Sequence, residues 1–154
     1  MSTDPLLERF ASLRTWRRGG ASAPHKPLLL LLALARVARG APRMVRFDDL
    51  EAELKALLAQ VGGTLPRPEY PFWHLRSDGL WELQGDERLE LRPAPRGGEQ
   101  TPSAGALRAA EVSGGLLEAD HQRLRQDGAL RQQLIEQLLS QYFPASQHAA
   151  LRQA

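Results

Sequence analysis

The chain has 154 residues, of which 42% are hydrophobic and 25% charged, and this balance indicates one globular domain with a real hydrophobic core. It contains no cysteine, which excludes disulfide bonds and thiolate metal sites. The net charge of +2 hides a division, because residues 1–46 carry a balance of +7 and residues 47–154 one of −5.

The basic first third predicts a face that meets a polyanion. Arginine outnumbers lysine by eighteen to two, and arginine makes bidentate contacts with phosphates and with guanine edges. A genome rich in G and C also raises the arginine content. A genome of that kind explains the high number of arginines better than it explains the excess of positive charge in residues 1–46.

The first predicted helix spans residues 4–17, with Leu6, Phe10 and Leu13 at helical spacing and Asp4 or Thr3 as its cap. A basic, flexible loop, Arg17-Arg18-Gly19-Gly20, follows it and leads to the next helix.

The second predicted helix begins between Pro24 and Pro27 and ends at Gly40. Its body, Leu28–Val37, is far shorter than the roughly 20 apolar residues of a membrane span, so it is a core helix. The N-terminus of the chain has no signal-peptide pattern, and we therefore expect a cytoplasmic protein.

A third helix begins at Asp48-Asp49 and ends at Gly62-Gly63, and an extended segment covers residues 64–69. The alternation over residues 70–76, with a turn at Asp78-Gly79 and a return over Leu80–Leu83, predicts a β-hairpin. Leu89–Arg92 is a candidate third strand.

A loop rich in proline and glycine covers residues 93–106, and helical segments follow at residues 107–111, 116–126, 129–142 and 145–152. The predicted fold is therefore a mostly helical, single-domain α+β structure. We expect a small antiparallel sheet of two or three strands packed on the central apolar helix.

No catalytic motif is present: the chain has no phosphate-binding Walker loop, no dinucleotide fingerprint and no evident serine triad. The four histidines (His25, His74, His121 and His148) lack metal-ligand spacing. We therefore expect a binding domain that is not an enzyme and that needs no cofactor or metal.

The candidate binding site is the start of the second helix, where His25 and Lys26 stand at a helix N-terminus that favours anions. Taken singly, His25 and Lys26 are better explained as an ordinary solvated helix start, and Tyr70-Pro71 as a simple turn. Phe72, Trp73 and Trp81 are better core residues than contact residues.

Two segments resemble the sulfur-binding domain of phosphorothioate-dependent, McrA-like type IV restriction endonucleases of bacteria. They are Ala-Pro-His-Lys-Pro-Leu-Leu-Leu-Leu at residues 23–31 and Glu-Tyr-Pro-Phe-Trp-His-Leu-Arg-Ser-Asp-Gly-Leu-Trp-Glu at residues 69–82. Residues 112–116 and 138–144 are also similar to that family. The resemblance implies a module for duplex DNA with a backbone phosphorothioate, whose relatives carry a separate C-terminal HNH nuclease domain that this chain lacks.

The resemblance also implies a sulfur pocket formed by Tyr70, Pro71 and His74 and closed by His25 and Lys26. Relatives can carry a small residue in place of His74 or an arginine in place of Lys26, so both are departures from part of the family. The implied DNA contacts come from four arginines: Arg17, Arg18, Arg76 and Arg96.

The chemistry is consistent with this reading, because sulfur is less strongly hydrated than oxygen and is buried at lower cost against apolar rings. Two other functions stay open. One is a DNA-binding domain that reads ordinary backbone or sequence, and the other is a scaffold whose basic face meets an acidic protein.

Overall fold

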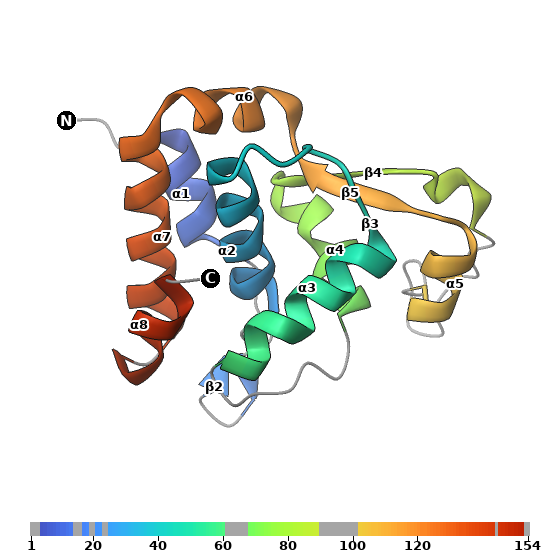
Figure 1. Ribbon diagram of the computed structural model, residues 1–154, viewed down its shortest axis with the longest axis horizontal. Helices are drawn as coiled ribbons and strands as arrows, with labels where there is room; N and C mark the ends of the chain where they lie inside the picture. The colour runs from blue at the N-terminus through green and yellow to red at the C-terminus, as the bar shows by residue number, and fades with distance from the viewer. Residues whose placement is uncertain are drawn as a thin grey trace.

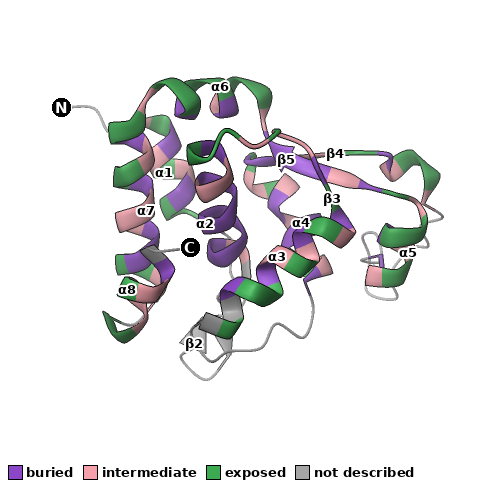
Figure 2. Cartoon of the chain, viewed as in Figure 1, coloured by how far each residue is buried: buried purple, intermediate pink, exposed green. Residues whose placement is uncertain are grey.

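The helix α2 (His25–Ala38) lies at the centre of the molecule (Figure 1). The structure is a computed structural model that describes residues 4–13, 17–18, 21–22, 25–60, 68–89, 102–143 and 145–152. Every side chain from Leu28 to Leu34 is buried (Figure 2). A helix that is apolar on all sides needs neighbours on all sides, and that requirement organises the fold.

The ends of α2 follow from local sequence. Pro27 lies in the first turn, where proline is tolerated because its missing N–H has no partner there anyway. At the other end Gly40 adopts φ = 75°, and its N–H donates to Val37 O at 3.0 Å while Ala41 N donates to Arg36 O at 2.9 Å. The predicted helix boundaries are confirmed.

Helices surround α2 on both sides. In Figure 1, α1 (Pro5–Ala11) and α7 (Gly128–Tyr142) lie on one side of it, and α3 (Phe47–Gln60) and α4 (Glu69–His74) on the other. The remaining helices are α5 (Ala104–Ala109), α6 (Glu118–Gln126) and α8 (Ala145–Arg152). Except for α4, these agree with the predicted helices, although α1 ends earlier and α5 begins earlier than expected.

A three-stranded antiparallel sheet is present, as predicted, and its residues Val45, Trp81 and Leu116 line a cleft with the second half of α2, but its composition differs. Its order is β3 (Val45–Arg46), β5 (Ser113–Leu116), β4 (Trp81–Gln84). The central strand β5 was not predicted, because glycine is rare in strands. Gly114 is paired with Val45 on one side and with Leu83 on the other.

Both glycines of β5 are required by close neighbours. A methyl group built on Gly115 would lie 2.4 Å from the backbone oxygen of Arg43, and one on Gly114 would lie 2.7 Å from Phe72 Cε2. Phe72 belongs to α4, so the missing side chain of Gly114 lets α4 settle directly on the sheet.

The predicted β-hairpin over residues 70–83 is wrong in its first half. Residues 69–74 form α4 and Leu75–Asp78 form the 3-10 helix η1, so only the return strand β4 exists. Phe72, Trp73 and Leu75 are all buried, which a half-buried strand does not allow, because alternate residues of a strand point to opposite faces. The predicted turn does have a counterpart, since Gly79 ends η1 with φ = 73°.

Two further predictions change. The expected loop after Arg17 contains a short antiparallel pair, β1 (Arg17–Arg18) and β2 (Ala21–Ser22). Leu89 follows the 3-10 helix η2 (Asp86–Arg88) and belongs to no strand, and the rest of that predicted strand lies outside the described residues.

Candidate nucleic-acid interface

The exposed face of α4 presents an aromatic pair. Tyr70 and His74 are one helical turn apart, so their side chains share a face. Their rings stack with centroids 5.4 Å apart and an interplanar angle of 26°. Tyr70 is 37% exposed, a high value for so large an apolar side chain. We call this pair the aromatic face.

The core fixes the position of the aromatic face. Phe72 is fully buried, with its ring edge-on to Phe47 at 5.0 Å and to Trp81 at 6.2 Å. Because Phe72 lies between Tyr70 and His74 in the helix, anchoring it directs the other two rings outwards.

The start of α2 meets η1 beside this face. Lys26 Nζ lies 2.7 Å from Asp78 Oδ2, and their side chains are only 12% and 2% exposed. Lys26 is 44 residues before Tyr70 in the chain, and α2 packs against α4. The segments of Lys26 and Tyr70, which the expected pocket would bring together, therefore lie close to each other.

His74 is held neutral by its surroundings. Burial is the largest influence that lowers the pKa of the imidazole below its ordinary value, and the positive charges of Lys26 and Arg76 lower it further. The carboxylate of Asp78 acts in the opposite direction. The aromatic face therefore meets solvent as an uncharged surface next to a paired ammonium group.

Arg76 is oriented by Trp73. Its guanidinium carbon lies 3.7 Å from the centroid of the indole ring, and its Nε donates to the backbone oxygen of Trp73 at 3.0 Å. This predicted DNA-binding arginine thus lies in η1, two residues after His74 of the aromatic face.

The other predicted site residues are described to different extents. Pro71 is a buried residue of α4, next to Tyr70 in the helix. His25 begins α2, and Arg17 and Arg18 form β1, but their side chains lie outside the described part of the structure. Arg96 lies entirely outside the described residues.

Folding pairs the described positive charges of the first third with acids. All six Lys and Arg residues there whose side chains are described pair with acids, most of them from later elements. Besides Lys26, they are Arg9 with Asp120, Arg36 and Arg39 with Glu53, Arg43 with Glu82, and Arg46 with Asp48 and Glu111.

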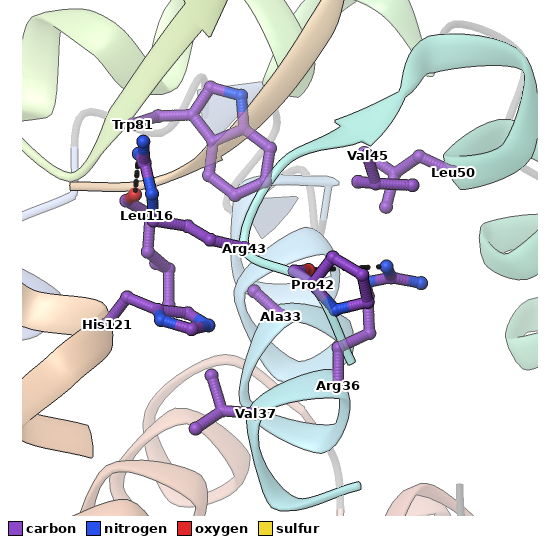
Figure 3. A pocket seen from close by; sticks show the side chains of 10 residues that line it. All are labelled: Ala33, Arg36, Val37, Pro42, Arg43, Val45, Leu50, Trp81, Leu116 and His121. Carbon is purple, nitrogen blue, oxygen red and sulfur yellow. Dashed lines mark hydrogen bonds between the residues drawn. The ribbon is translucent and has the colours of Figure 1, made fainter. Parts of the chain in front are cut away.

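A small cleft lies at the other end of α2, where the helix faces the sheet (Figure 3). Ala33, Val37, Trp81 and His121 line it together with Arg43, whose guanidinium donates to Leu116 O. About 10 Å³ is open to a water-sized group, which is too little for a nucleotide.

Neither a metal centre nor a membrane span is found in the described part of the chain. No group of three or more histidine or acidic side chains there could hold a metal ion. No helix there is long and apolar enough to cross a membrane.

The sequence analysis missed the roles of Asp78 and Trp73. Asp78 was interpreted only as a turn residue, and Trp73 only as core, whereas each fixes one cation beside the aromatic face. The spacing of Trp73 and Arg76, three residues apart, was the available signal for the second contact once the segment was taken as a helix.

Comparison with known proteins identifies the family of this chain. The family model of the ScoMcrA-like DNA sulfur-binding domain matches residues 3–154. A search of curated proteins gave no significant match.

Solved structures with high similarity include the sulfur-binding domain of ScoMcrA complexed with phosphorothioated DNA, at 28% identity and a TM-score of 0.81, covering 97% of this chain and 96% of that one. The sulfur-binding domain of SprMcrA complexed with phosphorothioated DNA is also 28% identical, with a TM-score of 0.70 and coverages of 97% and 94%. The type IV phosphorothioation-dependent restriction endonuclease ScoMcrA is 27% identical, with a TM-score of 0.75, and here 94% of this chain matches 27% of the larger protein. This chain belongs to the family of ScoMcrA-like DNA sulfur-binding domains.

Proposed function

We propose that this chain binds duplex DNA that carries a phosphorothioate in its backbone. The observation that carries the proposal is the meeting of the aromatic face of α4 with the Lys26 end of α2. The resemblance to sulfur-binding domains in complex with phosphorothioated DNA, over nearly the full length of both chains, supports it.

The two halves of this site suit the two properties of a phosphorothioate. The sulfur atom is weakly hydrated, so it loses little by leaving water for Tyr70 and the neutral ring of His74. The diester is still an anion, and Lys26 and the N-terminus of α2 balance that charge. A phosphate oxygen in the same place would lose its bound water without gaining equivalent hydrogen-bond donors. Selectivity therefore arises because removing the oxygen from water costs more than removing the sulfur.

The other predicted residues complete the proposed interface. His25 would close the pocket beside Lys26, and Pro71 would form part of its wall next to Tyr70. Arg17, Arg18, Arg76 and Arg96 would contact neighbouring phosphates or bases and give binding its salt dependence.

We place this binding in the bacterial cytoplasm, where chromosomal and invading DNA are found. Any cleavage of the DNA would be carried out by a separate nuclease domain of the HNH type, in the same or another chain.

The test is a binding titration of two duplexes that are identical except for one sulfur, prepared as separate stereoisomers. We expect tighter binding to one sulfur-containing isomer, and equal affinity for all duplexes would exclude the proposal. The alternative, a DNA-binding domain indifferent to sulfur, predicts that equality together with strong salt dependence.

One variant tests whether the Tyr70 ring contributes to the preference for sulfur. Tyr70→Leu removes the stacked ring, and we expect the preference for sulfur to fall about tenfold, because an apolar contact of one or two heavy atoms is worth roughly 1–2 kcal/mol. Tyr142→Leu is the matched control, since Tyr142 lies on α7 with its hydroxyl against the carbonyl of Phe10 at 3.3 Å. It should leave the preference unchanged.

A further inference from the structure

The ion pair between Lys26 and Asp78 has an unusual position for a DNA-binding site. It joins residues 52 apart in the chain, and the Asp78 side chain is 2% exposed. An ammonium group intended only to attract phosphate would serve better if it extended into solvent. Here it is largely buried and held against a buried carboxylate beside the aromatic face, a position that we call the floor of the site.

The pair changes what the floor of the site offers to an incoming phosphate. A lysine ammonium group has three donors, and at least one is directed to Asp78 Oδ2 at 2.7 Å. The negative charge of the Asp78 carboxylate, 2.7 Å away, also offsets the positive charge of the ammonium group. The floor is therefore less attractive to a strongly hydrated oxygen than a free lysine would be, while a weakly hydrated sulfur needs fewer donors.

The surrounding charges fit this pattern. Arg76 is the other described cation that acts electrostatically on His74, and its guanidinium is held over the Trp73 ring. Both cations beside the aromatic face are thus fixed by partners within the protein.

We infer that Asp78 is a positioning residue that sets the specificity for sulfur by holding Lys26 at the floor of the site. This inference rests on the proposed function and adds to it the residue that suppresses binding of ordinary phosphate. Asp78 acts through Lys26 and does not touch the DNA.

The first experiment compares dissociation constants of wild type and Asp78→Asn for matched duplexes with and without sulfur. We expect the variant to bind unmodified DNA more tightly, with the ratio of the two affinities falling about threefold to tenfold, the range for one net hydrogen bond to an ordinary phosphate oxygen. The slope of log K against log salt should steepen, by at most about 0.9, because Lys26 released from Asp78 neutralises phosphate charge more fully. Glu87→Gln, in η2, is the control for an equal change of net charge and should leave the ratio as in wild type.

A double-mutant cycle separates positioning from a purely structural role. In a Lys26→Gln background, Asp78→Asn should have no further effect on the ratio of affinities, because there is no ammonium left to hold. An unchanged ratio in folded Asp78→Asn, or an effect that persists without Lys26, would overturn the inference. If wild type itself does not prefer sulfur, it is the proposed function that fails.

A measurement on the unmutated protein guards against a variant that fails to fold. The chain has only two lysines, Lys26 and Lys55, and Lys55 is exposed on α3. In NMR spectra of the lysine ammonium groups we expect slow hydrogen exchange for Lys26 and fast exchange for Lys55, with the Lys26 signal retained when the sulfur-containing duplex is added. Exchange of Lys26 as fast as that of Lys55 would refute the inference.

Discussion

The substitution Gly114→Ala tests how the core positions the binding site. Gly114 lies in the central strand β5, directly beneath α4. An added methyl group would lie 2.6 Å from Trp81 Nε1 and 2.7 Å from Phe72 Cε2. Carbon atoms in contact are normally about 3.5–4.0 Å apart, so the methyl group would overlap each ring by about 1 Å.

Neither ring has room to retreat, because Phe72 is 0% and Trp81 3% exposed. Overpacking of this kind costs about 1–3 kcal/mol, and with two rings opposed we expect the upper part of that range. For a domain of this size each kcal/mol corresponds to about 2–4 °C, so the melting temperature should fall by about 5–10 °C.

The assay is thermal unfolding followed by circular dichroism, with Gly105→Ala as the matched control. Gly105 lies inside α5, and a methyl group there would be 3.9 Å from its nearest neighbour, Ser103 Oγ. Alanine is the better helix former by up to about 1 kcal/mol, so this control should melt at or above the wild-type temperature.

A second readout of Gly114→Ala is DNA binding at a temperature where the variant is folded. Displacing Phe72 displaces the aromatic face, so the preference for sulfur should weaken as well. If Gly114→Ala melts with wild type, the account of how α4 rests on β5 is refuted.

Two further predictions concern pH. The pKa of His74 is lower in the folded protein than in the unfolded chain, so the unfolded chain binds a proton more readily. The contribution of His74 to the free energy of unfolding is therefore present above about pH 6.5 and is lost as the pH falls through the folded-state pKa. Bound phosphate favours the imidazolium, so DNA affinity should instead rise over the same interval, and His74→Gln should remove both trends in unfolding and binding titrations. The hydrogen bond from Arg123 is the main cause that lowers the pKa of Asp4, so its contribution is present above the ordinary aspartate pKa and is lost as the pH falls through the lowered one. Asp4→Asn keeps the acceptor for Leu6 N but not the ion pair, so its melting temperature should vary less with pH in acid than that of wild type; an identical acid dependence would contradict this.

The predictions that held rest on signals within one segment. Pro27 and Gly40 mark the two ends of α2. The apolar run between them is too long for an ordinary strand, so it predicts a buried helix. Likewise, Asp4 was one of the two expected caps of the first helix, and its side chain accepts from Leu6 N.

The failures occurred where a segment is short and apolar. Residues 69–78 fit both a strand and a helix by pattern, and burial against Phe47 and Trp81 favours the helix. The strand β5 has two glycines, and it forms because the neighbouring rings and backbone occupy the space that side chains would need. Such choices depend on neighbours distant in sequence.

The sequence by itself determined the central helix, the basic residues at its start and the resemblance of Tyr70-Pro71 to a sulfur-binding motif. Only the tertiary structure decided that Tyr70 and His74 stack on one face of a helix, and that Lys26 is held by Asp78 while the other described cations of the first third are paired with acids. The physical reason is that charge and apolar character belong to single residues, whereas pairing and stacking depend on distance. Residues 52 apart in sequence have no defined distance until the chain has folded.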